Sequence, residues 1–289
     1  MNISSKTRLC ALIGDPVEHS MSPLIHNAAY AELGLDFVYV SFRVVKERLA
    51  EAVAGLRALN VRGFNVTMPH KVTIIPMLDA LDPLARQIGA VNTVVNDNGV
   101  LTGYNTDGLG VLKALQEKGV EPKGKKVVVI GAGGASRAVS YVLARQGARL
   151  TITNRREELD WAENIAVSIR KDLGAEVNVM ELGHMQLEKA LNGADILVQA
   201  TSVGMHPGPD TSLVPAELLK KGLTVFDVIY SPLKTRLLRD AEAAGCRTIG
   251  GVEMLVWQGV LCFEKWTGRT PSYQTMRREA LKMLQKENI

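Results

Sequence analysis

The sequence predicts an α/β protein with two domains, an N-terminal α/β substrate domain and a Rossmann-type domain built on a doubly wound parallel sheet. Three observations lead to this prediction. The chain has 289 residues, enough for about two domains of roughly 100–200 residues each. Apolar, strand-like runs alternate with helical patterns almost throughout, which is typical of βαβ units. A glycine-rich segment lies between an expected strand and an expected helix in the second half.

The first half of the chain alternates strands and helices and then forms a hairpin. We expect strands over 9–14, 36–44 and 63–68, and helices over 22–34 and 46–60. Ser22 is the expected N-cap of the first helix, and Gly34 is expected to end it. Residues 90–107 are typical of a hairpin that turns at Asn98-Gly99, which is a strong turn signal.

The second half has a clearer βαβ pattern. Strand, glycine loop, helix and second strand follow one another over 125–156. Further strands are expected over 195–205 and 224–232, and helices over 161–173, 185–192, 215–221 and 233–244. From Gly251 to the end the pattern is helical. The predicted domains are therefore 1–107 and 108–250, followed by C-terminal helices over 251–289.

Composition argues against several classes of protein. The chain has 34 basic and 30 acidic residues and a net charge of +4, so charge does not indicate a nucleic-acid partner. The three cysteines, Cys10, Cys246 and Cys262, are scattered and indicate neither a disulfide framework nor a zinc site. The histidines form no metal-binding spacing, and no metal is expected. No run approaches the ~20 apolar residues of a membrane span, so we expect a cytoplasmic protein with no membrane partner.

The glycine-rich loop predicts a dinucleotide-binding site. Gly131, Gly133 and Gly134 follow a strand and begin a helix. Glycines at these positions permit a tight turn and let backbone N–H groups approach a pyrophosphate at the helix N-terminus. Ser136 replaces the third glycine of the usual pattern and is still small. The alternative is a purely structural turn.

The end of the following strand favours NADP over NAD. An NAD site normally has Asp or Glu there, which binds the ribose 2′-hydroxyl. This chain has Asn154, Arg155 and Arg156, and guanidinium groups pair well with a 2′-phosphate. Glu157 follows, and its carboxylate is suited to the free ribose hydroxyl of NAD. The sequence therefore predicts NADP and leaves NAD as a second cofactor.

Short polar clusters in the first 107 residues predict a binding site for a small-molecule substrate. The clusters are "DPVEHSMSP", "NVTMPHK", "GAVNTVV" and "GYNTDG", each expected after an apolar strand. In open α/β sheets, ligands bind at the carboxyl ends of strands. The lysine of "NVTMPHK", Lys71, is suited to proton transfer, because carbonyl reduction by hydride leaves an oxygen that must be protonated. His70 is its neighbour, and we expect it to point elsewhere.

Taken together, the motifs resemble the shikimate dehydrogenase family, including its quinate/shikimate dehydrogenase relatives. They occur in order along essentially the whole chain: "HSMSP", "NVTMPHK", "GAVNT", "NTDG", "GAGGASRA", "TSVGM", "DVIYSP" and "LVWQG". The resemblance implies reversible, NADP-dependent reduction of 3-dehydroshikimate to shikimate in aromatic amino-acid biosynthesis. It also implies that 1–107 binds substrate and carries the catalytic groups, that 108–250 binds NADP, and that the C-terminal helices return to the first domain.

The resemblance implies a role for individual residues. Lys71 and Asp107 would form the catalytic pair. Residues implied at the substrate are Ser20, Ser22, Thr67, Lys71, Asn92, Asp107, Tyr230 and Gln258. Residues implied at the cofactor are Gly131, Ala132, Gly133, Gly134, Ala135, Asn154, Arg155, Arg156, Val228 and Gly251. The chain departs from NADP-specific relatives at Arg156 and Leu159, where they usually have threonine and a basic residue.

Two other functions are alternatives to NADP-dependent shikimate dehydrogenation. One is the same chemistry with quinate as substrate and NAD as cofactor. The other is a non-catalytic sensor that binds a dinucleotide without turnover, which has no need of a Lys71–Asp107 pair. The sequence leaves the oligomeric state open, and a homodimer is one of the outcomes it allows.

Overall fold

The computed structural model describes residues 3–287, and side chains over 3–285, so the end of the predicted C-terminal segment, 288–289, lies outside the described residues. The chain divides into two compact units. The first contains 3–107 together with 256–287, and the second contains 108–255. The chain thus leaves the first unit once and re-enters it inside a helix.

The first unit contains a six-stranded mixed sheet with the order β2-β1-β3-β5-β6-β4. Its strands are β1 (Arg8–Gly14), β2 (Phe37–Arg43), β3 (Gly63–Val66), β4 (Ala80–Leu81), β5 (Thr93–Asp97) and β6 (Val100–Tyr104). β2, β1 and β3 are parallel, whereas β5 is antiparallel to both β3 and β6. The predicted hairpin is confirmed: Asn98 and Gly99 connect β5 to β6 with positive φ angles of 53° and 93°.

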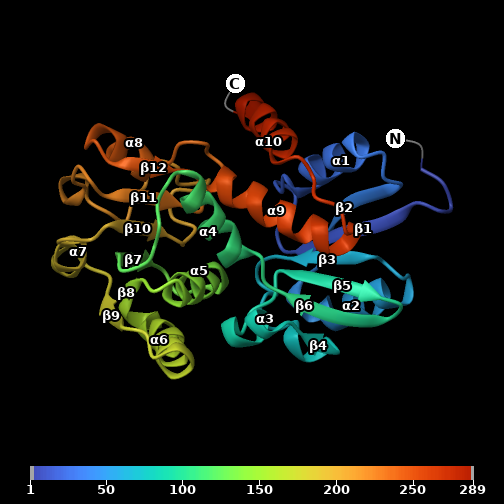
Figure 1. Ribbon diagram of the computed structural model, residues 1–289, viewed down its shortest axis with the longest axis horizontal. Helices are drawn as coiled ribbons and strands as arrows, with labels where there is room; N and C mark the ends of the chain where they lie inside the picture. Colours follow the sequence, from blue (N-terminus) through green and yellow to red (C-terminus); the bar gives the residue numbers. More distant parts are fainter. Residues whose placement is uncertain (1–2, 288–289) are drawn as a thin grey trace. The chain divides into compact units, whose positions relative to one another are not determined.

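Helices cover both faces of this first sheet (Figure 1). They are α1 (Ser22–Glu32), α2 (Leu49–Ala58), α3 (Pro83–Ile88), α9 (Gly251–Thr267) and α10 (Tyr273–Glu287). One face packs against α2, through Ile13, Phe64 and Val66 on the strands and Val53 and Leu56 on the helix. The other face carries a buried aromatic cluster that joins α1, β2 and α9, formed by His26, Tyr30, Tyr39, Phe263 and Trp266.

The second unit contains a six-stranded, wholly parallel sheet with the order β12-β11-β10-β7-β8-β9. Its strands are β7 (Lys126–Ile130), β8 (Arg149–Asn154), β9 (Val177–Glu181), β10 (Ile196–Gln199), β11 (Thr224–Asp227) and β12 (Arg247–Ile249). The strand order reverses direction beside β7, as in doubly wound dinucleotide-binding folds. The predicted Rossmann-type sheet is confirmed.

Helices also lie on both faces of the second sheet (Figure 1). They are α4 (Asp107–Glu117), α5 (Gly134–Arg145), α6 (Leu159–Leu173), α7 (His184–Leu191) and α8 (Arg236–Ala243). Alternate residues of β7, Val128 and Ile130, pack with α7 and α8. Because side chains alternate along a strand, Val127 and Val129 face the opposite side, and α5 and α6 pack together along the β7–β9 part of the sheet.

Several local predictions are wrong in instructive ways. Ser22 is the first residue of α1 and Met21 is its N-cap; the Ser20 hydroxyl accepts the N–H of Ser22 instead. The helix predicted over 46–60 begins as a short 3₁₀ turn, Lys46–Arg48, before α2. The helix predicted over 215–221 is only the 3₁₀ turn Ala216–Leu218. β4, β9, β12 and α3 were not predicted, because they are short or weakly apolar.

The C-terminal region contains two helices rather than one continuous segment. Gly268 has a φ of +68°, and α9 ends just before it. An L side chain is disfavoured in this conformation, so glycine is suited to the position.

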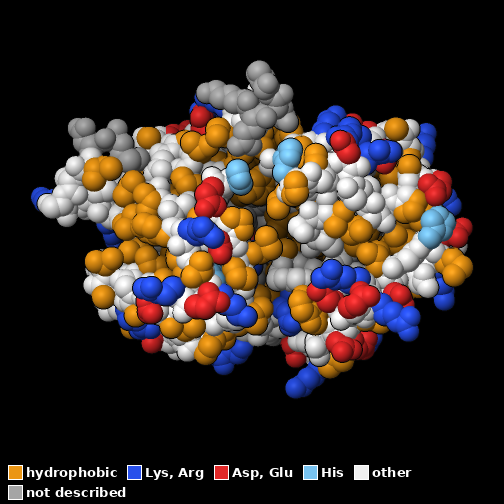
Figure 2. All heavy atoms as spheres, turned by 180° about the vertical axis from the view of Figure 1, so that it is seen from behind, with side chains coloured by type: hydrophobic (Ala, Val, Ile, Leu, Met, Phe, Trp, Pro, Cys, Tyr) orange, Lys and Arg blue, Asp and Glu red, His pale blue; other side chains and the backbone are white. Residues whose placement is uncertain are grey.

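On the face of the molecule shown in Figure 2, basic and acidic side chains are interspersed among apolar ones.

Candidate active site

The polar clusters predicted for the first unit lie at one edge of its sheet. The Asp15 N–H donates to Met68 O at 2.9 Å and links the loops after β1 and β3. The Asn92 N–H donates to Tyr104 O at 3.1 Å and links the start of β5 to the end of β6. One detail of the prediction is wrong, because "GAVNT" precedes β5 rather than following a strand. β5 runs antiparallel, so its start lies at the same edge.

The loops after β1 and β3 approach so closely that a glycine is needed between them. A Cβ atom on Gly14 would lie 2.2 Å from Thr67 Cγ2 and 2.9 Å from Met68 O. The second of these is a backbone atom that cannot move independently. Gly14 therefore lets "DPVEHSMSP" and "NVTMPHK" pack side by side.

Lys71 and Asp107, the predicted catalytic pair, are in direct contact. Lys71 Nζ lies 2.6 Å from Asp107 Oδ2. Lys71 lies in the turn region after β3, and Asp107 is the first residue of α4. Their side chains are 16% and 7% exposed. Because little water screens a pair this buried, its charges interact more strongly than those of a surface pair.

Asn92 orients the carboxylate of this pair. Its Nδ2 atom donates to Asp107 Oδ1 at 2.8 Å, while Lys71 occupies the other oxygen. Its own Oδ1 atom accepts the backbone N–H of Thr106 at 2.8 Å. Three predicted residues, which are far apart in the sequence, thus form one hydrogen-bonded group at the sheet edge.

The remaining predicted substrate residues of the first unit lie on neighbouring elements. Thr67 is half-buried at the end of β3, and its N–H donates to Ile13 O at 2.9 Å. Ser20 and Ser22 lie at the start of α1, whose N-cap Met21 makes no side-chain cap and whose first turn has no acidic residue. Such a helix start favours an anion. Gln258 is buried in α9.

His70 does not contact the catalytic pair. Its ring Nε2 lies 2.6 Å from Val44 O, and the residue is fully buried. The ring therefore fixes the "NVTMPHK" loop to the segment after β2. The prediction that His70 points elsewhere than the site is confirmed.

In the second unit, the glycine loop leaves the start of α5 open to a ligand. Gly131 has a φ of +103°, and a Cβ on it would lie 2.7 Å from Thr201 Cγ2. Gly133 is the N-cap of α5, which has no side-chain cap. Ser136, in place of the third glycine, is buried and donates to Gly131 O at 2.5 Å. A helix start that has glycine at its N-cap and first position and no side-chain cap is suited to a pyrophosphate, so these residues fit a dinucleotide.

The end of β8 carries the predicted ribose-binding residues. Asn154 is buried and its Nδ2 atom donates to Glu158 O at 2.8 Å. Arg155 and Arg156 are exposed. Arg155 forms an ion pair with the carboxylate of Glu158, not with that of Glu157. Sequence reasoning missed Glu158, although its i,i+3 spacing from Arg155 is a signal for such a pair.

Two residues predicted to contact the nicotinamide lie against each other. A Cβ on Gly251 would lie 2.3 Å from Val228 O, so only glycine fits there without a shift of the backbone. The Gly251 N–H donates to Ile229 O at 3.2 Å. The start of α9 therefore packs closely on the loop after β11. Tyr230 lies in the same loop, and its substrate role stays a prediction.

Asp227 was not predicted and holds this loop in place. It is fully buried at the end of β11 and accepts the Thr235 hydroxyl at 2.6 Å and the Ile229 N–H at 3.1 Å. Gln199 Nε2, at the end of β10, donates to it at 3.3 Å. Burial raises the pKa of Asp227 to about 6. The signal in the sequence was an acidic residue inside an apolar run, "VFDVIY".

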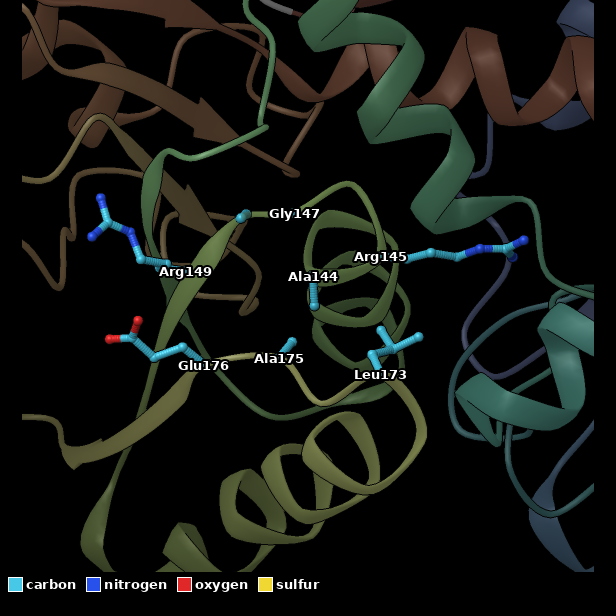
Figure 3. Close-up of a pocket in the computed structure, with 8 residues that line it drawn as sticks. Ala144, Arg145, Gly147, Arg149, Leu173, Ala175 and Glu176 are labelled. Carbon is cyan, nitrogen blue, oxygen red and sulfur yellow. The ribbon is translucent and has the colours of Figure 1, made fainter.

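A shallow pocket in the second unit lies away from these residues. It is lined by the end of α5, the start of β8 and the segment between α6 and β9, as Figure 3 shows. Arg149 is the first residue of β8 and Glu176 directly precedes β9, so both lie at the amino ends of these strands, whereas the glycine loop follows the carboxyl end of β7. Because ligands of doubly wound sheets bind at the carboxyl ends, this pocket is not the cofactor site.

Within residues 3–287, no group of three or more His, Cys, Asp or Glu side chains is placed to hold a metal ion. None of the helices in that range combines the length and the apolar character that a membrane crossing requires.

Family models match three segments of the chain. Residues 12–94 match the shikimate dehydrogenase substrate binding domain. Residues 113–228 match the family described as shikimate/quinate 5-dehydrogenase. Residues 251–281 match the shikimate 5′-dehydrogenase C-terminal domain.

Individual proteins match nearly the whole chain. The shikimate dehydrogenase (NADP⁺) of Methanosarcina acetivorans is 47% identical over 96% of this chain and 99% of that protein. The structure of shikimate 5-dehydrogenase from Listeria monocytogenes with shikimate and NAD has a TM-score of 0.91 and 42% identity. It covers 96% of this chain and 98% of its own. A shikimate dehydrogenase structure with NADP⁺ has a TM-score of 0.92 and 42% identity, and covers 98% of each chain.

Proposed function

This chain belongs to the shikimate dehydrogenase family, and we propose that it catalyses the reversible, NADP-dependent reduction of 3-dehydroshikimate to shikimate. The observation that carries the proposal is the buried contact of 2.6 Å between Lys71 Nζ and Asp107 Oδ2. A proton-transfer pair at the ligand-binding edge of a sheet is what a dehydrogenase requires. The reaction lies in the biosynthesis of aromatic amino acids.

Lys71 would transfer the proton, and Asp107 would position Lys71. NADPH, when bound, supplies the hydride for the carbonyl carbon. The Lys71 ammonium would donate a proton to the carbonyl oxygen during reduction, and the Lys71 amine would take it back during oxidation. Asp107, held by Asn92 at its other oxygen, would keep the Lys71 nitrogen in place and accept a hydrogen bond from a ring hydroxyl.

The other predicted residues would bind and orient the two ligands. Ser20 and Ser22, at the start of α1, would hold the substrate carboxylate. Thr67, Asn92 and Gln258 would contact ring hydroxyls. Gly131 to Ala135, at the uncapped start of α5, would hold the pyrophosphate.

The rest of the cofactor would be held by residues that follow strands of the second sheet. Asn154, Arg155 and Arg156 would hold the adenosine ribose and its 2′-phosphate. Val228 and Gly251 would meet the nicotinamide through their backbone, which is supported by their close packing. Tyr230, in the same loop as Val228, would assist the substrate carboxylate.

Quinate dehydrogenation with NAD is the second candidate function. It is favoured by the match of residues 113–228 to the shikimate/quinate 5-dehydrogenase family. Two carboxylates also weaken the preference for NADP over NAD. Glu157 would repel a 2′-phosphate, and Glu158 already pairs with the Arg155 guanidinium. A non-catalytic sensor is disfavoured, because the Lys71–Asp107 pair has no function in one.

A steady-state matrix tests these candidates directly. Shikimate and quinate are each oxidised with NADP and with NAD, and the appearance of reduced nicotinamide is followed by absorbance. We expect the highest kcat/KM for shikimate with NADP. A higher value for quinate with NAD would establish the second candidate. If neither substrate were turned over, the result would favour the non-catalytic sensor.

We also propose that the protein is cytoplasmic and forms a homodimer. β2 is an edge strand of the first sheet, and Phe42 on it is 43% exposed, a combination that favours pairing with a second copy. Light scattering after gel filtration should give twice the chain mass of 31.4 kDa, and a monomer mass at micromolar concentration would contradict the dimer.

A further inference from the structure

A continuous series of buried hydrogen bonds runs through the first sheet to Asp107. Tyr39 Oη donates to Asn65 Oδ1 at 2.7 Å, and Asn65 Nδ2 donates to Thr93 Oγ1 at 3.1 Å. Thr93 Oγ1 donates to Asn92 Oδ1 at 3.0 Å, and Asn92 Nδ2 donates to Asp107 Oδ1 at 2.8 Å. None of the five residues is more than 5% exposed. Tyr39, Asn65 and Thr93 were not among the predicted site residues.

The direction of donation is fixed by two backbone groups. The Thr106 N–H can only donate, and it donates to Asn92 Oδ1 at 2.8 Å, so Asn92 Nδ2 must face Asp107. The backbone carbonyl oxygen of Asn92 can only accept, and it accepts from Asn65 Nδ2 at 3.0 Å. The other side-chain atom of Asn65, Oδ1, must therefore face Tyr39. Every donor in the series therefore points toward the carboxylate of Asp107.

The series begins at elements that carry other predicted substrate residues. The ring of Tyr39 stacks on that of His26, on α1, with ring centroids 4.5 Å apart. Cys262 Sγ, on α9, lies 3.7 Å from Asn65 Oδ1. Cys262 is four residues after Gln258 and so lies on the same face of that helix. The buried series thus connects both helices to the Lys71–Asp107 pair.

We propose that Thr93 and Tyr39 are positioning residues for the proton-transfer pair, acting through Asn65 and Asn92. Thr93 is the critical link, because its hydroxyl is the only side-chain group that joins the Asn65 and Asn92 amides in this series. Without that hydroxyl, Asn92 Oδ1 keeps the Thr106 N–H as a donor but loses the Thr93 hydroxyl, so one of the bonds that fix the amide is missing. The amide would then hold the Asp107 carboxylate less firmly in the position that places Lys71 Nζ at 2.6 Å. The inference rests on the proposed role of Lys71 and Asp107 in proton transfer.

Two substitutions at Thr93 separate the hydroxyl from the shape of the side chain. Thr93→Val keeps the volume and removes the hydroxyl, whereas Thr93→Ser keeps the hydroxyl and removes a methyl group. We expect Thr93→Val to lower kcat for shikimate oxidation by about 10–100-fold, the scale of a misplaced catalytic group. KM for NADP should not change. Thr93→Ser should retain kcat within about 3-fold of the parent, because it keeps the hydrogen bonds.

Thr153→Val is the matched control. Thr153 is also fully buried, and its hydroxyl has no hydrogen-bond partner among the described residues, so its loss should leave kcat unchanged. Equal kcat in Thr93→Val and the parent would overturn the proposal, and so would equal losses in Thr93→Val and Thr93→Ser. Should Thr93→Val fail to fold, Tyr39→Phe carries the test, and an unchanged kcat there would overturn it. A parent without dehydrogenase activity would instead refute the proposed function.

Discussion

At the scale of single residues, Lys71 is the residue whose role can be tested most directly. Lys71→Ala removes the group proposed to move the proton and leaves Asp107 without its partner at 2.6 Å. We expect kcat for shikimate oxidation to fall by about 10²–10⁴-fold, the usual contribution of a positioned acid or base, with a smaller change in KM. Steady-state kinetics with NADP measures both.

Lys113→Ala is the matched control for this substitution. Lys113 is an exposed lysine on α4, the helix that begins with Asp107. Its removal changes net charge by the same amount and should leave kcat within about 2-fold, as expected for a surface position. A Lys71→Ala enzyme that behaves like Lys113→Ala would remove Lys71 from the mechanism.

Cofactor choice is also decided by single residues at the end of β8. Glu158 pairs with Arg155 and so competes with a 2′-phosphate for its guanidinium. Glu158→Gln should therefore tighten NADP binding modestly, by about 2–5-fold, because exposed ion pairs are weak. Arg155→Ala combined with Arg156→Ala should weaken NADP by about 10-fold or more, since charge-assisted hydrogen bonds to phosphate are lost. Equilibrium titration of nucleotide fluorescence or heat measures each Kd.

NAD serves as the control ligand for these variants because it has no 2′-phosphate. Its Kd should hardly change in the arginine double variant. Glu157→Gln should act in the opposite sense and weaken NAD more than NADP. If the two arginine substitutions weakened NAD and NADP equally, the arginines would support the loop or the adenine rather than a 2′-phosphate.

At the scale of the elements, the buried aromatic cluster between α1, β2 and α9 predicts how stability depends on pH. His26 stacks on Tyr39 with ring centroids 4.5 Å apart. Burial lowers the pKa of His26 to about 3, below the value of about 6.5 for an unfolded histidine. The unfolded chain therefore binds the extra proton first, so stability is complete above pH 6.5 and decreases as the pH falls below it.

His26→Phe should remove this dependence while keeping a stacked ring. Between pH 6.5 and pH 5 the parent should lose about 1.6 kcal/mol of stability through His26, and the variant should not. Urea unfolding followed by circular dichroism at the two pH values measures the difference. An equal loss in the parent and in His26→Phe would show that His26 is not the group that titrates.

Elements with strong local signals were predictable, and elements fixed by tertiary contacts were not. The hairpin at Asn98-Gly99 and the turn at Gly131 need positive φ angles. Asparagine and glycine adopt such angles most readily, so the residue types alone predict both turns. β12 has only three residues, Arg247–Ile249, and forms because β11 offers it a parallel edge. The predicted N-cap of α1, Ser22, is wrong by one residue, because the helix already begins at Ser22. The backbone N–H of Ser22 donates to the Ser20 hydroxyl.

At the scale of the whole molecule, the ordered motifs predicted the family and the fold class, and the structure added the connections between them. The sequence placed Asn92 and Asp107 fifteen residues apart, and only pairing of β5 with β6 brings them into contact. Thr93 looked like an ordinary strand threonine. Its importance became visible only when Asn65, from another strand, was found against its hydroxyl.

The two ligands should stabilise the whole protein through separate sets of residues. A ligand at about 100 times its Kd stabilises the native state by about 2.7 kcal/mol, which raises the melting temperature by several degrees. Ser20→Ala combined with Ser22→Ala should abolish the rise caused by shikimate and retain the rise caused by NADP. The Arg155→Ala, Arg156→Ala variant, with NADP bound about 10-fold more weakly, should keep only about half of the stabilisation by NADP and all of the rise caused by shikimate. Thermal melts with each ligand alone measure both rises. If the serine variant lost both rises, Ser20 and Ser22 would be needed for the fold, since residues that only bind the substrate carboxylate leave cofactor binding intact.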